Sequence, residues 1–285
     1  MFWKSAYFLL TLKNKVLYKP QYYTFKKIGD FYVMNFVSKD SIVRQIWGNT
    51  DTILFIFAGA AAEFSLNKAV DWLYYTGKLP KDPLGRLFST VAYAQKIVFS
   101  TLDQAHAAID QITLIHEQVE TTRNAKIPDW AYRDVLFMLI NYSIQAFELL
   151  DRKLSPDEKE EVYDTFFRMG NRMKINELPE NFNDWQIKHA QQLKENLAYT
   201  HFSKDLYLQY QKHLGQLRYL LMRKIQALIV PGRVNQLLQL GKGKSVIPIL
   251  WLYKLSRKLK MDHTIRNLIL PGRYKEQILG LGRNE

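Results

Sequence analysis

The sequence lacks cysteine altogether: none of its 285 residues is Cys. Without thiolates the chain has no cysteine nucleophile, zinc finger, iron–sulfur cluster or thiolate-ligated haem. It also lacks the motifs His-Glu-x-x-His, Gly-x-Ser-x-Gly and Gly-x-Gly-x-x-Gly, and the phosphate loop. These absences argue against zinc peptidases, serine esterases, dinucleotide-dependent enzymes and nucleotide hydrolases. No Glu stands three residues before any of the six histidines, so the paired motif of di-iron helical bundles is missing too.

Long apolar runs are also lacking. The longest, Thr52–Ala62 and Val246–Tyr253, are too short to span a bilayer and are typical of buried helices. The amino end, Met1–Leu10, mixes aromatic and leucine side chains with lysine and has no small-residue cleavage site. The sequence therefore predicts neither a transmembrane span nor a secretory signal, and we expect a cytoplasmic protein.

Apolar residues recur with helical spacing along most of the chain. With 47% hydrophobic and 14% aromatic residues, the chain is able to bury a large core. Ser155, Pro156 and Glu158 form the pattern of a capping box with proline at the first helical position. We therefore predict an all-α fold, a single multi-helix domain with a cleft between helices. The predicted helices are Ile53–Trp72, Arg86–Ser100, Asp103–Thr121, Asp134–Leu150, Ser155–Met173, Asn183–Leu197 and Lys204–Ile229.

Charge is distributed unevenly. Residues 1–44 hold eight Lys or Arg and two Asp or Glu, residues 212–285 hold fifteen and three, and residues 45–211 hold seventeen and twenty-two. The two ends therefore carry +6 and +12, and the middle carries −5. We predict a basic aromatic N-terminal segment (1–40), a helical core (41–210) and basic C-terminal hairpins packed on that core (211–285). The basic ends suit solvated helix faces or, equally, an anionic membrane surface at the inner side of the membrane.

A repeat occurs near the carboxyl end. Ile225-x-x-Leu228-Ile-Val-Pro231-Gly232-Arg233 returns forty residues later, from Ile265 to Arg273. Proline stops a helix and glycine permits a tight turn, so each copy predicts a helix-turn-helix hairpin. Lysine and arginine alternate with Trp and Tyr between the copies, and base-reading polar residues are not arranged as a recognition helix requires. Nucleic acid is therefore a minor alternative to the core or a membrane as the partner of these hairpins.

Three residues form a pattern on two successive predicted helices. Arg86 and Thr90 stand four apart and share one helix face, and His116 follows on the next helix at the edge of a stripe formed by Ala105, Ala108, Ile112, Ile115 and Val119. A lone histidine at such an edge is more often a core residue than a metal ligand. His106 lies about eighty degrees away around the helix, and His189, His201, His213 and His263 lie in polar stretches typical of solvated residues.

Arg86-x-x-x-Thr90 followed by Ile115-His116-x-x-Val119 resembles the catalytic domain of the latex clearing protein and rubber oxygenase family, which includes the mycophenolic acid pathway oxygenase. In that family the corresponding histidine binds haem b iron from the proximal side. The resemblance covers roughly residues 41–185. Further stretches that carry it are Ser41–Thr50, Thr52–Asp71, Trp130–Asp134, Leu154–Glu158, Asn176–Pro179 and Trp185.

The resemblance implies a haem b oxygenase in which His116 binds the iron and dioxygen reacts with an apolar, lipid-like or isoprenoid-like substrate. It also implies that Arg86 and Thr90 belong to the site, with Arg86 either neutralising a haem propionate or assisting dioxygen. Rubber-cleaving members carry Lys immediately before the Thr, where this chain has Ser89. We therefore extend haem binding, and not rubber cleavage, to this chain. The alternatives are a haem-binding sensor or carrier without turnover, and a haem-free helical scaffold.

Overall fold

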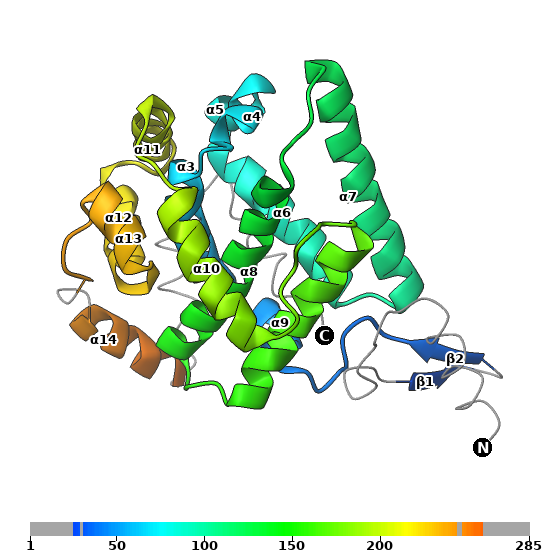
Figure 1. The fold of residues 1–285 in the computed structure, drawn as a ribbon. Coiled ribbons are helices and arrows are strands. Elements are labelled where there is room, and N and C mark those ends of the chain that lie inside the picture. Colours follow the sequence, from blue (N-terminus) through cyan, green and yellow to red (C-terminus); the bar gives the residue numbers. More distant parts are fainter. Residues whose placement is uncertain (1–24, 29–30, 244–246, 259–285) are drawn as a thin grey trace.

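Helices make up most of the computed structural model, which describes residues 25–28, 31–243 and 247–258 (Figure 1). The all-α prediction is confirmed, with one addition, a hairpin of two antiparallel strands, β1 (Phe25–Ile28) and β2 (Phe31–Met34). The helices are α2 (Ile42–Gly48), α3 (Thr50–Leu66), α4 (Val70–Tyr75), α5 (Lys78–Lys81), α6 (Pro83–Val98), α7 (Leu102–Arg123), α8 (Asp129–Leu150), α9 (Pro156–Arg172), α10 (Phe182–Glu195), α11 (His201–Leu214), α12 (Gln216–Ile229), α13 (Gly232–Leu238) and α14 (Ile247–Lys258).

Side-chain caps fix where several helices begin. The capping box predicted for α9 is present, because Ser155 Oγ accepts from the Glu158 amide and the Glu158 carboxylate accepts from the Ser155 amide. A second box, Thr101 with Gln104, starts α7, and the Asp82 carboxylate accepts from the Gly85 amide at the start of α6. These bonds satisfy amide groups that have no partner within the helix itself.

Two of the predicted helices are each broken in two. Ile53–Trp72 divides into α3 and α4 because Asn67 leaves the helical conformation, and its side chain accepts from the Ala69 amide and donates to the buried Asp134 carboxylate. Lys204–Ile229 divides into α11 and α12 at Gly215, whose φ of 73° and ψ of 165° suit glycine only. The spacing of apolar residues does not reveal such breaks, because the same helical spacing continues on both sides of each break.

Helix α3 forms the centre of the fold. Almost all of its residues are buried, and it packs against α8, α11, α12 and α13. Contact with α8 is especially close at Gly59, where an added Cβ would lie 2.2 Å from the buried Tyr142 ring. Among the described residues, no helix combines the length and apolar character needed to cross a membrane.

The first copy of the C-terminal repeat forms a turn between α12 and α13. Val230 and Pro231 are extended there, and Gly232 is the first residue of α13 rather than part of the turn. The prediction that glycine opens this turn is therefore wrong, since Gly232 does not have a positive φ. Helices α12 and α13 pack on α3. The second copy and residues 1–24 lie outside the described residues, and the predicted domain boundaries stay predictions.

Candidate functional site

Arg86 and Thr90 form one hydrogen-bonded unit on α6. The Arg86 guanidinium donates from one nitrogen to Ser89 Oγ and to Thr90 Oγ1, both at 3.1 Å. Each hydroxyl in turn donates to the Arg86 carbonyl oxygen, at 2.8 Å and 3.2 Å. All three side chains are half-buried. The four-residue spacing that the sequence displays therefore holds the guanidinium in one orientation.

The Arg86 guanidinium has no carboxylate partner among the described residues. A structural role for Arg86 would need a carboxylate such as Asp82 or Asp110, but Asp82 caps the start of α6 and Asp110 pairs with Arg172 at 2.6 Å. Burial lowers the pKa of Arg86, and an electrostatic interaction with Tyr93 partly opposes this shift. A half-buried cation without a counter-ion is costly unless an anion reaches it. This guanidinium is therefore free to bind an anionic group.

His116 belongs to the inward-facing stripe of α7. Ala105, Ala108 and Ile109 are buried, and His116 is half-buried two turns further along the same face. Ile115, which the sequence placed in this stripe, is instead 38% exposed, so that assignment is wrong. The inward-facing stripe of α7 therefore passes through His116 and the buried Glu120 rather than through Ile115.

The His116 imidazole makes no hydrogen bond to any residue in the described part of the chain. Its Nδ1 is buried without a partner, and no described residue bonds to the other ring nitrogen. Burial, reinforced by the positive charge of Arg86, lowers the pKa of His116 to about 4, against the opposing effect of Glu120. Tyr132 of α8 packs edge-on against the ring, with centroids 5.0 Å apart. Arg86 of α6 and Tyr132 of α8 thus both interact with His116 of α7, and the three residues form the candidate site.

Glu120 anchors the segment that connects α7 to α8. Its carboxylate lies one turn beyond His116 and accepts from Lys126 Nζ at 2.7 Å, the Ile127 amide at 2.9 Å and the Tyr132 hydroxyl at 3.1 Å. Those three donors lower the pKa of Glu120 although burial opposes the shift. The sequence reasoning passed over Glu120. The signal available was its i, i+4 spacing from His116, which puts both on one face.

A buried polar cluster joins α3, α8 and α10. Glu63 accepts from the Tyr142 hydroxyl at 2.8 Å and from Gln192 Nε2 at 3.4 Å, and His189 Nε2 lies 3.9 Å from it. His189 is only 7% exposed and stacks on Trp185 with ring centroids 4.9 Å apart. The prediction that His189 is solvated is therefore wrong. Its charged neighbours in sequence face solvent, whereas its own helix position faces the core.

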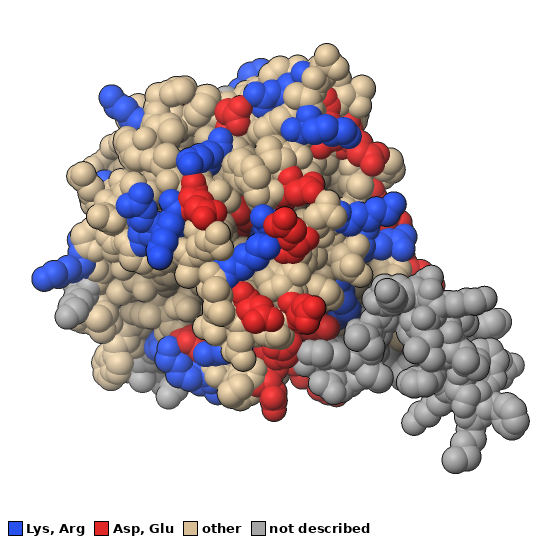
Figure 2. Space-filling model, viewed as in Figure 1, with Lys and Arg blue, Asp and Glu red and all other residues tan. Residues whose placement is uncertain are grey.

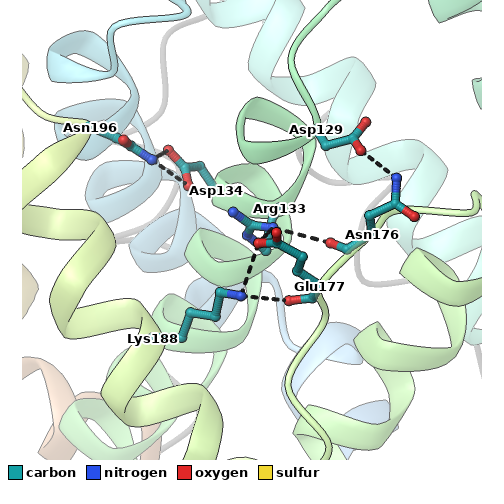
Figure 3. A network of polar contacts seen from close by, with 7 residues as sticks. All are labelled: Asp129, Arg133, Asp134, Asn176, Glu177, Lys188 and Asn196. Carbon is teal, nitrogen blue, oxygen red and sulfur yellow. Dashed lines mark hydrogen bonds and ion pairs between the residues drawn. The ribbon is translucent and has the colours of Figure 1, made fainter.

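Asp134 connects the same helices near the start of α8 (Figure 3). Its carboxylate accepts from the Asn67 amide group at 2.8 Å and from the Asn196 amide group at 2.9 Å. No cation pairs with it in the described part of the chain, and burial raises the pKa of Asp134 to about 7. The stretch Trp130–Asp134, which carries part of the family resemblance, thus contributes Tyr132 to the site and Asp134 to the scaffold.

The connection between α9 and α10 is fixed to α8 by a second set of contacts (Figure 3). The Arg133 guanidinium donates to the Asn176 carbonyl at 3.1 Å and to the Glu177 carboxylate at 3.0 Å. Lys188 of α10 donates to the same carboxylate at 3.2 Å, and Asn176 donates to Asp129 at 2.5 Å. Asp129, Asn176 and Glu177 are exposed and Arg133 and Lys188 are half-buried, and all five belong to the scaffold rather than to the site around His116.

The described residues contain no group of three or more His, Cys, Asp or Glu side chains that could hold a metal ion. Haem needs only one ligand from the protein, because the porphyrin supplies four ligands to the iron and a single imidazole suffices as the fifth. His106, the other histidine of α7, lies edge-on to Phe36 at 6.4 Å, and burial and nearby Arg172 lower its pKa. His116 differs from His106 because Arg86 influences its pKa and Tyr132 of α8 contacts its ring.

A search among individually curated proteins found no match to this sequence. The family model "ER-bound oxygenase mpaB/B′/Rubber oxygenase, catalytic domain" matches residues 45–249. This match includes Arg86, Thr90 and His116, and it extends past the part of the chain for which the motifs gave a resemblance. Because it covers most of the 285 residues, the chain belongs to the mpaB and rubber oxygenase catalytic-domain family.

Proposed function

We propose that this protein is a haem b-dependent oxygenase that brings dioxygen to an apolar small molecule, with His116 as the protein ligand of the iron. One observation carries the proposal: among the described residues, the neutral His116 imidazole has no hydrogen-bond partner and the Arg86 guanidinium that influences it has no carboxylate partner, in a chain of an oxygenase family. In a helical core, both groups are ordinarily satisfied by other residues of the chain.

The residues fit haem in two respects. A ligand histidine must be neutral, and a pKa of about 4 keeps His116 neutral at physiological pH. Haem b carries two anionic propionates, and Arg86 is a cation that lacks a carboxylate partner in the described residues. Bound haem would supply the activation of dioxygen, which no side chain of this protein provides.

The chain's own residues orient and shield the site. Ser89 and Thr90 hold one nitrogen of the Arg86 guanidinium, which leaves its other nitrogens to bind a propionate. Tyr132 restricts rotation of the His116 ring by edge-on contact, and Glu120 holds Tyr132 in place through its hydroxyl. Ile112, one turn before His116, adds a half-buried apolar side chain, which favours an apolar substrate nearby.

The test is an absorption spectrum of protein purified from haem-replete cells, which we expect to show a Soret band. His116→Ala should lose this band, and His106→Ala should keep it. His106 is a matched control because it is a half-buried histidine on the same helix. Exogenous imidazole should restore the band to His116→Ala, a result that a merely misfolded variant would not give. Equal haem content in the two variants would refute the ligand assignment.

Two further variants separate the roles of Arg86. Arg86→Leu should reduce haem content more than it lowers the free energy of unfolding, whereas Arg86→Lys should retain part of the haem because it keeps the charge. If Arg86→Leu only lowers the melting temperature and leaves haem content intact, Arg86 is structural. Haem binding without dioxygen consumption in the presence of alkenes or prenyl compounds would identify a carrier or sensor. Absence of haem from the wild-type protein would identify a scaffold.

A further inference from the structure

The segment from α11 to α14 is strongly basic. Residues 201–258 contain eleven Lys or Arg and one acidic residue, Asp205, whose carboxylate accepts from the Tyr74 hydroxyl at 2.8 Å. Residues 45–200, in contrast, contain 21 of the 27 Asp and Glu residues of the chain. The positive charge of α11–α14 is therefore not neutralised within this segment, and it attracts an anionic partner.

The same segment exposes large apolar side chains. Leu217 is 82% exposed and Trp251 is 65% exposed. Exposure of such large apolar side chains to water is unfavourable for a helix face that contacts only solvent. Five of the ten large hydrophobic residues that are exposed on the described surface belong to this segment: Leu208, Leu217, Leu220, Ile247 and Trp251. Single exposed apolar residues are ordinary on protein surfaces, but their concentration in a segment of strong net positive charge is not.

Apolar and basic side chains share one face on each helix. On α11 the exposed residues Lys204, Leu208 and Lys212 recur every four positions. On α12 Leu217, Leu220 and Lys224 follow the same helical spacing. On α14 the set is Ile247, Trp251 and the half-buried Lys254. Each face thus places a lysine one turn from an exposed apolar side chain.

These helices lie on one side of the molecule. Helices α11, α12, α13 and α14 line the left edge in Figure 1, and α7 lies at the opposite edge. In the same orientation, Figure 2 shows Lys and Arg without Asp or Glu along the left edge of the surface, whereas both signs of charge are mixed over the centre and right. The helices that carry the apolar and basic faces therefore lie together on one side of the molecule.

We propose that the exposed faces of α11, α12 and α14 bind the surface of a lipid bilayer that contains anionic lipid. Leucine, isoleucine and tryptophan gain by entering the region between headgroups and acyl chains, and lysine one turn away reaches back to the phosphates. Tryptophan in particular favours that interfacial region. This proposal is independent of haem and adds a location to the chemistry of the site.

The apolar residues distinguish a bilayer from a nucleic acid. A protein that binds the phosphate backbone of DNA uses Lys, Arg and polar side chains, and exposed aliphatic residues contribute little to it. Leu217, which is 82% exposed, would gain by entering a lipid surface and would contribute little on a phosphate backbone. Binding should therefore depend on both kinds of residue, with charge supplying attraction at a distance and apolar contact supplying attachment that salt does not remove.

The test is cosedimentation of the full chain with sucrose-loaded vesicles. One set contains phosphatidylcholine alone, and the other contains phosphatidylcholine with phosphatidylglycerol. We expect binding to the anionic set at low ionic strength and substantial release at roughly 0.5 M salt, where the Debye length is a few ångströms. Lys224→Gln/Lys254→Gln should weaken partitioning by roughly ten- to thirtyfold, from the contribution of each basic residue near an anionic surface.

Matched variants elsewhere on the surface complete the design. Leu217→Ser/Trp251→Ser should lower partitioning about tenfold or more and remove the fraction that resists salt. Leu114→Ser on α7, a residue 57% exposed, and Lys81→Gln/Lys96→Gln on α5 and α6 should bind like the wild type. Four outcomes would overturn the proposal: no binding to either vesicle set, equal binding to both, equal loss in the control variants, or a Leu217→Ser/Trp251→Ser variant that binds anionic vesicles and duplex DNA as tightly as the wild type does.

Discussion

Replacing Asp134 with asparagine should change how the stability of this protein depends on pH. The Asp134 carboxylate is 1% exposed, accepts from the side-chain amides of Asn67 and Asn196, and pairs with no cation in the described residues. Burial raises its pKa from 3.8 to about 7. Because the folded protein holds this proton more tightly than the unfolded chain, the associated stability is fully present below pH 3.8 and is lost as pH rises through 7.

The magnitude follows from the two pKa values. Their separation, at about 1.4 kcal/mol per pH unit, corresponds to about 4 kcal/mol. In Asp134→Asn, the introduced carboxamide can place its carbonyl oxygen where one carboxylate oxygen accepts from both amide groups, at 2.8 Å and 2.9 Å in the wild type, and it carries no charge at any pH. The variant should therefore match the wild type near pH 4 and exceed it by about 4 kcal/mol above pH 7.

Urea unfolding, followed by circular dichroism from pH 4 to pH 8.5, measures this difference. Subtracting the variant's free energy of unfolding from that of the wild type removes contributions common to both, including that of His116. Asp151→Asn, at the exposed end of α8, controls for the loss of one negative charge. Parallel curves for the wild type and Asp134→Asn would show that the carboxylate is ionised in the folded protein, and the reasoning from burial would then be wrong.

Three other perturbations test the site and the scaffold. The pKa of His116, lowered from 6.5 to about 4, predicts that the wild type loses about 3 kcal/mol relative to His116→Gln as pH falls from 6.5 to 4, measured by urea unfolding of haem-free protein. Gly59→Ala should destabilise by about 3 kcal/mol or more because its Cβ would lie 2.2 Å from the Tyr142 ring, whereas Gly232→Ala, with no atom within 4 Å, should be neutral or slightly stabilising in the same assay. Ser155→Ala removes the cap of α9 and should cost about 1 kcal/mol, seen as a lower thermal midpoint, and Ser155→Asp should recover most of it.

Local signals in the sequence determined the class of fold and the ends of several helices. Apolar spacing identified the helical segments because a helix places residues three and four apart on one face whatever surrounds it. The Ser155–Glu158 capping box likewise needs no distant residue, and it occurs where it was predicted. Motif spacing on α6 and α7 indicated the family, and the match over residues 45–249 confirmed it.

Only the tertiary structure decided which side chains are buried and what they meet. The break at Asn67 depends on Asp134, which is distant in the sequence, and the burial of His189 depends on Glu63 and Trp185. Those partners come from other helices, so no periodic pattern within one helix reveals them. The same holds for the site, since Arg86 and His116 were visible as residues, whereas the absence of a carboxylate at Arg86 and of a hydrogen bond at His116 emerged only when α6, α7 and α8 were packed together. Burial converts these two groups from ordinary helix residues into candidates for binding, because water no longer satisfies them.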